Sequence, residues 1–375
     1  MTNRERKKTN LPRVVVAMSG GVDSSVAAYL LSREGYEVIG ITMRLWSADE
    51  DVEIAADHQG CCSIDDIEDA RRVCQSIGIP HYVLDVRNEF QEHVIKYFTD
   101  EYRKGRTPHP CIACNDRIKF DFLLSRSQMM EAAYIATGHY ARIALNHTGR
   151  FMLREGVDRL KDQSYVLFGL SQSQLSKILL PIGGYTKGQI RDFAFEAGLH
   201  IANKLDSQEI CFIPSGDYRQ FIKDKTEPAP GNIIDSEGTI VGSHPGVEFY
   251  TVGQRRGLNI TPSQLNLPEG TKIFVTGVNP MSKTIMVGTS EDLMGHGVLV
   301  DRVNYIDGVA PHGPINIDAK IRYNGIKSSA VLYPDGESAV LRFDDPQRAI
   351  TPGQAAVFYA DDCVLGGGYI DGPVK

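Results

Sequence analysis

The chain has 375 residues and a formal net charge of −7 at pH 7, and 42% of its residues are hydrophobic. This length allows two or three domains with a sizeable core, and no apolar run approaches the roughly 18 residues that cross a membrane. The acidic balance argues against a broad nucleic-acid surface and leaves only local basic patches. Because the polar N-terminus does not resemble a signal peptide, the seven cysteines indicate a reducing cytoplasm and redox or metal chemistry.

The first half of the chain predicts an α/β domain with a parallel sheet. Apolar, β-branched runs typical of buried strands occur at residues 13–18, 37–43, 81–86 and 133–137. Helices are expected between them: one ends at Gly35, one is N-capped by Ser63 and ends at Gly78, and one covers residues 88–103. Since the carboxyl ends of parallel strands share one edge of a sheet, nucleotide contacts are expected at that edge.

The turn Ser19-Gly20-Gly21-Val22-Asp23-Ser24-Ser25 follows the first strand and opens the first helix. Its adjacent glycines let backbone N–H groups converge, and the helix N-terminus adds partial positive charge, so the turn predicts a phosphate site. Its serines can add hydroxyl donors, whereas Asp23 fits beside an anion only if a divalent metal lies between them. The turn lacks the Lys of a Walker A loop. It resembles the loop of the N-type ATP pyrophosphatase (PP-loop) superfamily, whose members adenylylate a substrate oxygen.

A C-x-x-C pair, Cys111 and Cys114, follows Pro108 and Pro110. Two prolines exclude a helix here, so we expect a loop. Cations flank the pair at Arg103, Lys104, Arg106, Arg117 and Lys119. Nearby cations lower the pKa of a thiol and favour the nucleophilic thiolate. The first three of these cations are also expected to supply a confined RNA-binding patch.

The second half of the chain changes in character. Residues 186–189 form a capping box for a helix that ends at Gly198. Beyond about residue 215, short β-like runs recur with glycines between them, at residues 272–278, 285–287, 315–323, 339–343 and 355–359. This spacing predicts a small β domain and then a β-barrel. We expect three domains, at residues 1–215, 216–285 and 286–375.

Seven motifs occur in a fixed order: SGGVDSS, GRTPHPC-x-x-CN, TGHYA, KDQSY, DSQEICF, TVGQRRGL and TPGQAAVFY. In this order they resemble the MnmA family of bacterial tRNA-specific 2-thiouridylases, over nearly the whole chain. The resemblance implies a tRNA-uridine 2-sulfurtransferase that uses ATP and Mg²⁺ to replace the C2 oxygen of the wobble base, uridine 34, with sulfur. It also implies an N-terminal PP-loop domain of the adenine nucleotide alpha hydrolase-like type, a small central mostly-β domain and a C-terminal β-barrel that contacts tRNA. A cysteine desulfurase or sulfur-relay protein would supply the sulfur.

The resemblance also implies roles for individual residues. ATP would contact Ala17, Met18, Ser19, Gly20, Gly21, Val22, Asp23, Ser24, Met43 and Gly138. Cys114 matches the family nucleophile, and Cys211 matches the persulfide carrier. The target base would meet His109, Pro110 and Cys111, and the tRNA would lie along His139, Lys161, Asp162, Gln163, Arg322, Tyr323 and Gln354. Gln163 can both donate and accept, which suits the Watson–Crick edge of a uracil flipped out of its stack.

Cys111 departs from the better-known members, which have an aspartate at this position. The resulting C-x-x-C is similar to a subset of thiolases that hold a 4Fe–4S cluster on three cysteines, here Cys111, Cys114 and Cys211, with the fourth iron left for a sulfide. A persulfide relay needs only Cys114 and Cys211. The spacing favours the cluster because a second cysteine has no evident role in the relay. A structural zinc would want a fourth ligand.

Two other classes of function stay open. One is a PP-loop ligase that forms an amide on a small molecule, which would need neither the C-x-x-C pair nor the barrel. The other is a non-catalytic RNA-binding or iron–sulfur protein, against which the intact Ser19–Ser25 turn argues.

Overall fold

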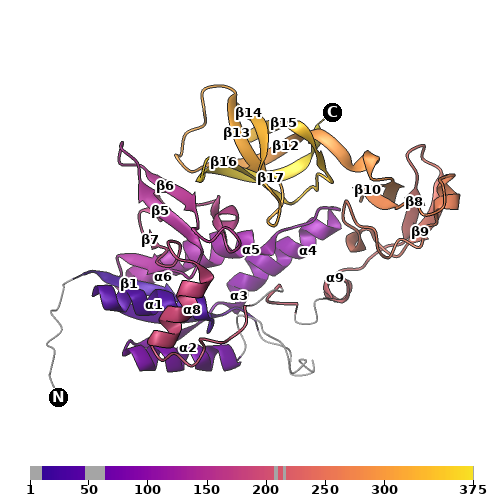
Figure 1. Cartoon of the computed structure of the whole chain (residues 1–375). Coiled ribbons are helices and arrows are strands. Elements are labelled where there is room, and N and C mark those ends of the chain that lie inside the picture. The colour runs from indigo at the N-terminus through magenta and orange to yellow at the C-terminus, as the bar shows by residue number, and fades with distance from the viewer. Residues whose placement is uncertain (1–10, 47–63, 207–209, 214–216, 375) are drawn as a thin grey trace, which may run out of the picture. The chain divides into compact units, whose positions relative to one another are not determined.

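The computed structural model describes residues 11–46, 64–206, 210–213 and 217–374. The predicted N-cap at Ser63 lies outside the described residues. The chain divides into two compact units, drawn in Figure 1. The first unit is Met1–His93 with Cys114–Gly216, and the second is Val94–Ala113 with Asp217–Lys375. The second unit therefore contains a segment of the predicted N-terminal domain.

The first unit is built on a parallel sheet, as the sequence predicts. Its strand order is β3-β2-β1-β4-β7. The strands are β1 (Arg13–Ala17), β2 (Glu37–Arg44), β3 (His81–Asp85), β4 (Tyr134–Ala136) and β7 (Ile178–Leu179). The strand order reverses at β1, which lies between β2 and β4, and such a switch point is where open α/β sheets bind nucleotides. The turn after β1 and the segment after β4 both lie at this edge.

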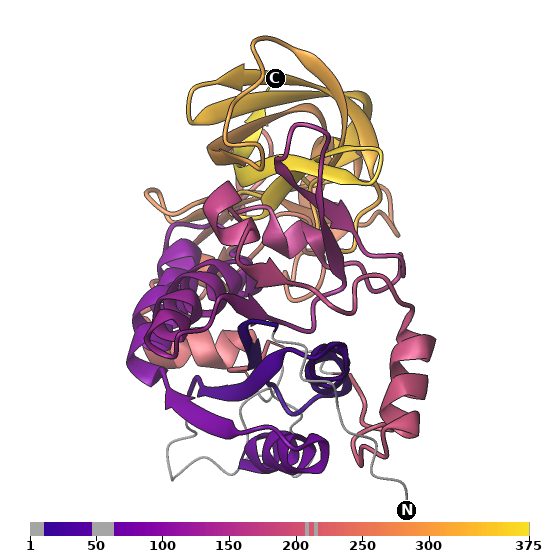
Figure 2. The ribbon, with the colours of Figure 1, turned by 90° about the vertical axis from the view of Figure 1, so that its left-hand side faces the viewer.

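Three helices share one apolar core with the sheet: α1 (Val22–Glu34), α2 (Ile64–Ile77) and α8 (Lys187–Glu196). Val14 and Val16 of β1 join a single cluster with Val26, Val73 and Ile190 from these helices. The helices can be followed in Figure 1 and, after a quarter turn, in Figure 2. Two of the predicted helix signals are confirmed by their geometry. Gly35 ends α1 in the left-handed region at φ 101°, and Thr186 and Gln189 make both bonds of the capping box of α8.

The remaining elements of the first unit are short. They are α3 (Arg87–Phe90), the π-helix η2 (Cys114–Phe122), α6 (Leu123–Met129), the hairpin β5 (Ala141–Leu145) and β6 (Phe151–Glu155), the 3₁₀ turn η3 (Ser164–Leu167) and α7 (Gln172–Leu175). The predicted helix at residues 88–103 consists of α3, a π-helical turn η1 (Gln91–Ile95) and α4 (Lys96–Arg103). The division between the two units falls inside η1.

The prediction of a loop around the C-x-x-C pair is wrong. Residues Pro110–Ala113 form the short helix α5, and η2 continues directly from Cys114. Pro110 is the first residue of α5, where its missing N–H is not needed for a helical hydrogen bond. Only Pro108 lies outside the helix.

The second unit contains a small sheet and a closed barrel, and the predicted fold class is confirmed. The small sheet has the order β10-β11-β8-β9, with strands β8 (Gly231–Ile234), β9 (Ile240–His244), β10 (Phe274–Asn279) and β11 (Thr284–Gly288), preceded by α9 (Tyr218–Lys225). The barrel has the order β12-β15-β14-β13-β16-β17 and is closed because β12 also pairs with β17. Its strands are β12 (Met294–Tyr305), β13 (Ile315–Lys320), β14 (Ser328–Asp335), β15 (Ser338–Arg348), β16 (Ala355–Ala360) and β17 (Cys363–Val374).

Three barrel strands, β12, β14 and β17, are missing from the predicted runs. β17 reads CVLGGGYIDGPV, and its glycines and proline weaken any local strand signal. Pairing with β12 and β16 makes it a strand nevertheless. No helix within the described residues has the length and apolar character needed to cross a membrane.

Gly20 tests how tightly the turn after β1 is packed. A Cβ at Gly20 would lie 2.3 Å from the backbone oxygen of Asp66, and its φ is +72°. We expect Gly20→Ala to lower the free energy of unfolding by about 3 kcal/mol or more, because left-handed strain and backbone overlap add. Gly78→Ala is the matched control, since Gly78 has φ +73° with nothing within 4 Å, and it should cost only about 1 kcal/mol. Urea unfolding measures both values, and equal losses would mean that the overlap relaxes freely.

Candidate functional site

The Ser19–Ser25 turn is held together by its own side chains. The Ser24 hydroxyl oxygen accepts from the Ser19 N–H at 3.1 Å, and the Ser25 hydroxyl donates to the Gly21 carbonyl at 2.8 Å. Ser25 is fully buried. These hydroxyls, predicted as phosphate donors, therefore shape the turn, and the backbone N–H groups at the start of α1 remain the main donors that this segment can offer to an anion.

Asp23 lies beside a lysine in this structure. Lys187 Nζ is 2.8 Å from Asp23 Oδ1 and 2.9 Å from Oδ2. The hydroxyl of Tyr140 donates to Asp23 Oδ1 at 2.7 Å. Burial and the Asp23 carboxylate both raise the pKa of Tyr140, so the phenol keeps its proton. The sequence predicts a divalent metal beside the Asp23 carboxylate. In this structure the Lys187 ammonium balances the negative charge of Asp23.

Gly138 brings the segment after β4 against the same turn. A Cβ at Gly138 would lie 2.6 Å from the Ser24 nitrogen and 2.7 Å from the carbonyl carbon of Asp23, so only glycine permits this approach. Met43 lies at the carboxyl end of β2 and is buried. The structure thus places the residues predicted to contact ATP at one edge of the sheet; their contact with ATP stays a prediction.

The KDQSY segment is tied to the same edge. The Gln163 side-chain oxygen accepts from the Tyr140 N–H at 3.0 Å, and the Gln163 N–H donates to the Tyr140 carbonyl at 2.8 Å. Asp162 Oδ1 accepts from the Gly156 N–H at 2.9 Å. Lys161 Nζ lies 2.8 Å from Asp206 Oδ2. Gln163 and Asp162 therefore hold the backbone at Tyr140 and Gly156 in place. Their contact with RNA stays a prediction.

His139 lies inside the first unit with a relative exposure of 6%. Its Nδ1 is 2.7 Å from the Thr137 hydroxyl oxygen. Burial lowers the pKa of the imidazole well below its usual value, so the ring is neutral. An approaching tRNA would meet little of this side chain in the arrangement seen here.

In the second unit, the segment predicted to contact the target base is bound to the barrel. The Thr107 N–H donates to the Pro352 carbonyl at 2.8 Å, and Gln354 Nε2 donates to the Thr107 carbonyl at 2.9 Å. The rings of His109 and Tyr323 are 5.9 Å apart in an edge-on arrangement. Three predicted RNA contacts from distant parts of the sequence, at 109, 323 and 354, therefore lie around one segment.

Arg322 also lies in this region, where its guanidinium donates to the carbonyl oxygens of Arg348 and Ala349. Ala349 has φ 51°, in the left-handed region. This contact satisfies carbonyl groups at a tight bend after β15 and gives Arg322 a structural role, beside the predicted one.

The predicted basic patch at residues 103–106 is already paired with acids. Arg106 contacts Glu101 at 2.8 Å and Asp371 at 2.7 Å, with 17% of its side chain exposed. Lys104 lies 3.1 Å from Glu101, and Arg103 lies 3.2 Å from Asp100. Arg106 is thus a tether between this segment and β17 rather than one of three interchangeable cations.

The three predicted cluster cysteines have different surroundings. Cys111 is exposed on α5 in the second unit, whereas Cys114 begins η2 in the first unit with a relative exposure of 8%. Cys211 is half-buried in a turn closed by the Ile213 N–H and the Ile210 carbonyl at 2.9 Å. Within the described ranges, no group of three or more His, Cys, Asp or Glu side chains is placed to hold a metal ion. The 4Fe–4S prediction gains no support from this arrangement, nor does a magnesium site made by protein ligands alone.

Sequence reasoning missed the charged residues that surround the turn. Besides Lys187, Lys204 Nζ lies 2.8 Å from Asp66, 2.6 Å from Asp69 and 3.2 Å from the Gly20 carbonyl oxygen. Lys187 did carry a signal, since it follows the N-cap Thr186 of a predicted helix, but no local pattern connects it to Asp23.

His109 gives the second unit a dependence on pH. Burial lowers the pKa of its imidazole to about 4, against about 6.5 in an unfolded chain. The unfolded state therefore binds the extra proton first, and stability present above pH 6.5 is lost as the pH falls toward 4. Between about pH 7.5 and about pH 5, we expect the wild type to lose about 2 kcal/mol more than His109→Gln in urea unfolding.

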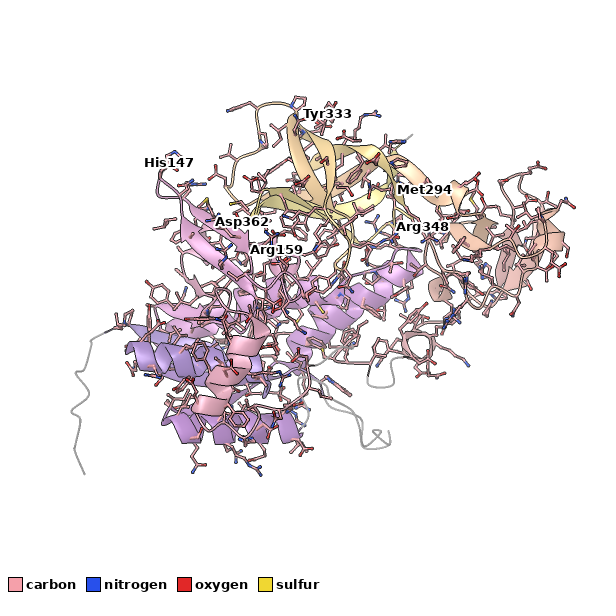
Figure 3. The ribbon with its side chains drawn as sticks, in the orientation of Figure 1. His147, Arg159, Met294, Tyr333, Arg348 and Asp362 are labelled. Atoms are coloured by element: carbon pink, nitrogen blue, oxygen red, sulfur yellow. The ribbon has the colours of Figure 1, made fainter. Side chains whose placement is uncertain are left out.

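The control for this experiment is His147→Gln. His147 is exposed on the hairpin of β5 and β6, and Figure 3 labels it. A wild type and a His109→Gln variant with the same pH dependence would show that the fold does not lower the pKa of His109.

The chain is similar to known protein families over most of its length. The model described as tRNA methyl transferase HUP domain matches residues 12–215. The tRNA methyl transferase PRC-barrel domain matches residues 219–289, and the aminomethyltransferase beta-barrel domain matches residues 295–370. A tRNA-specific 2-thiouridylase MnmA of Clostridioides difficile is 47% identical over 363 residues, covering 96% of this chain and 98% of its own. The protein of the same name from Pelotomaculum thermopropionicum is 48% identical, covering 96% and 97%.

Proposed function

This chain belongs to the MnmA family of tRNA-specific 2-thiouridylases, and from that membership we propose that it is an ATP-dependent tRNA-uridine 2-sulfurtransferase. In this proposal, the C2 oxygen of uridine 34 in tRNA is replaced by sulfur, and AMP and pyrophosphate are released. Because the proposed substrate is tRNA and the proposed chemistry uses free thiolates, we propose that the protein acts in the cytoplasm.

The observation that carries the proposal is the position of the Ser19–Ser25 turn. It lies after β1, where the strand order reverses, and Gly138 packs directly against it. A turn of this kind presents N–H groups and a helix N-terminus to a polyphosphate. This supports ATP as the nucleotide, with Ala17–Ser24 at the phosphates and Met43 and Gly138 at the adenosine.

The first step activates the base. The uracil C2 oxygen attacks the α-phosphorus, the bond to the β-phosphate bridge breaks, and pyrophosphate leaves with the electron pair. The adenylate turns a poor leaving oxygen into part of AMP. Mg²⁺ would accompany ATP and would supply positive charge at its phosphates, because Mg²⁺ commonly binds through substrate phosphates and water.

The second step uses two cysteines. A sulfur donor such as a cysteine desulfurase leaves a persulfide on Cys211. The Cys114 thiolate attacks the inner sulfur, a disulfide forms between the two residues, and sulfide departs. The sulfide attacks C2 and AMP leaves with the C–O electron pair. A dithiol reductant then restores both thiols.

The tRNA contacts are proposed from both units. The wobble base must leave the anticodon stack, which costs a few kcal/mol. His109, Pro110 and Cys111 are proposed at the base, and the tRNA lies along two sets of residues. They are His139, Lys161, Asp162 and Gln163 in the first unit, and Arg322, Tyr323 and Gln354 in the second.

The test is an assay with purified protein, Mg²⁺–ATP, a sulfur donor and an unmodified tRNA transcript. We expect AMP release that depends on tRNA, together with 2-thiouridine at position 34. AMP release without tRNA would favour a small-molecule ligase instead. Tight tRNA binding without any ATP cleavage would favour a non-catalytic RNA-binding protein.

Cysteine variants decide how sulfur is carried. In the same assay, we expect Cys114→Ser and Cys211→Ser to lose about 100-fold or more in rate, because each removes a sulfur that changes partners. Cys111→Ser should keep most of the rate, and Cys363→Ser, at the start of β17, is the control. If Cys111→Ser is as inactive as the other two, and anaerobically purified wild type contains iron and sulfide, the two-cysteine route is wrong.

A further inference from the structure

Lys187 lies between two carboxylates at the edge of the Ser19–Ser25 turn. Its ammonium is 2.8 Å from Asp23 Oδ1 and 2.7 Å from Asp206 Oδ1. Only 12% of its side chain is exposed. The ring of Tyr140 adds a face of negative potential, with its centroid 6.0 Å from Nζ. This lysine is therefore held at one point, directly beside the residues that would meet phosphate.

The backbone of Lys187 is fixed as well. Lys187 is the first residue of α8, its N–H donates to Asp158 Oδ2 at 2.9 Å, and the preceding Thr186 closes the capping box. Ile190 and Ala194 of the same helix are fully buried in the core that contains β1 and α1. An ammonium on such a support loses little further freedom when it contacts a ligand.

Asp206 is the second carboxylate that contacts the lysine. Lys161 and Arg191 also approach Asp206, at 2.8 Å and 3.5 Å. Although burial acts against it, hydrogen bonds from Lys161 and Lys187 keep the pKa of Asp206 below its usual value. Asp206 therefore stays charged, and because Lys161 and Arg191 share it, Lys187 keeps charge to spare for an anion that binds beside it.

Asp23 creates the need for such a cation. A carboxylate in the first turn of α1 repels a polyphosphate unless positive charge lies between them. The turn has no lysine of its own, unlike a Walker A loop. Lys187, more than 160 residues later in the chain, stands in that place.

We propose that Lys187 is a catalytic residue of the adenylylation step, that its ammonium contacts the pyrophosphate end of ATP, and that Asp206 is its positioning residue. The proposal rests on the proposed function for its reaction, but its ligand, pyrophosphate, can be tested alone. When the bond between the α-phosphorus and the bridging oxygen breaks, the electron pair stays on pyrophosphate. A fixed ammonium stabilises that growing charge at no cost of rearrangement.

The first experiment compares Lys187→Gln, Lys187→Arg and Asp206→Asn with the wild type. For tRNA-dependent AMP release, we expect Lys187→Gln to lose about 100-fold in kcat. Lys187→Arg keeps the charge and should recover part of the rate. Asp206→Asn should lose about tenfold, because the lysine remains but is less well held. Lys177→Gln, which removes an exposed lysine of the same unit, should match the wild type.

The second experiment uses inorganic pyrophosphate and AMP as separate probes, titrated calorimetrically into each protein without tRNA. Lys187→Gln should weaken pyrophosphate binding by about tenfold or more and leave AMP binding unchanged. This measurement stands even if the wild type fails to thiolate tRNA, so a failure of the proposed function is told apart from a failure of the role of Lys187.

Two results would overturn the proposal. One is a Lys187→Gln variant that binds pyrophosphate as tightly as the wild type. The other is an equal loss of pyrophosphate, AMP and tRNA binding together with a lower melting temperature, because that pattern means that the lysine only supports the fold.

Discussion

The ion pair between Asp23 and Lys187 sets the charge beside the Ser19–Ser25 turn. Asp23 belongs to α1 and Lys187 to α8, and the two helices meet because Val26, Ala27, Ile190 and Ala194 pack in one apolar core. Burial of these small and branched side chains supplies the free energy that brings two distant charges together. The hydrophobic contact between the helices thus sets the electrostatics at the edge of the sheet.

Close backbone approach is the second constraint on this edge. Gly20 allows α2 to press its Asp66 backbone against the turn, and Gly138 allows the segment after β4 to touch Ser24. Lys204 joins these elements by contacting both Asp66 and the Gly20 carbonyl. With no Cβ at either glycine, the turn is clamped by backbone from two sides. A rigid turn loses little entropy on binding an anion, which favours pre-organised recognition.

In the second unit, several contacts hold the short segment around residues 106–109 against the barrel. Glu101 and Asp371 grip Arg106 from two sides, and Gln354 donates to the Thr107 carbonyl. These contacts attach the residues around His109 to the barrel, whose closure by β12 and β17 leaves no loose sheet edge there. In this arrangement the proposed base-contacting segment belongs, by its contacts, to the barrel rather than to the parallel sheet.

Several features followed from the sequence itself, because each depends on residues close together in the chain. They are the parallel strands, the strand–turn–helix around Ser19–Ser25, the C-terminal end of α1, the N-cap of α8 and the β-rich second half. Three other features did not follow from the sequence. They are the π-helix that starts at Cys114, the glycine-rich strand β17 and the grouping of residues 94–113 with the barrel. The partners of Asp23 were equally hidden, since Tyr140 and Lys187 reach it across more than 100 residues. Local patterns record propensity and periodicity, whereas pairing between distant charges and strands is decided only when the core closes.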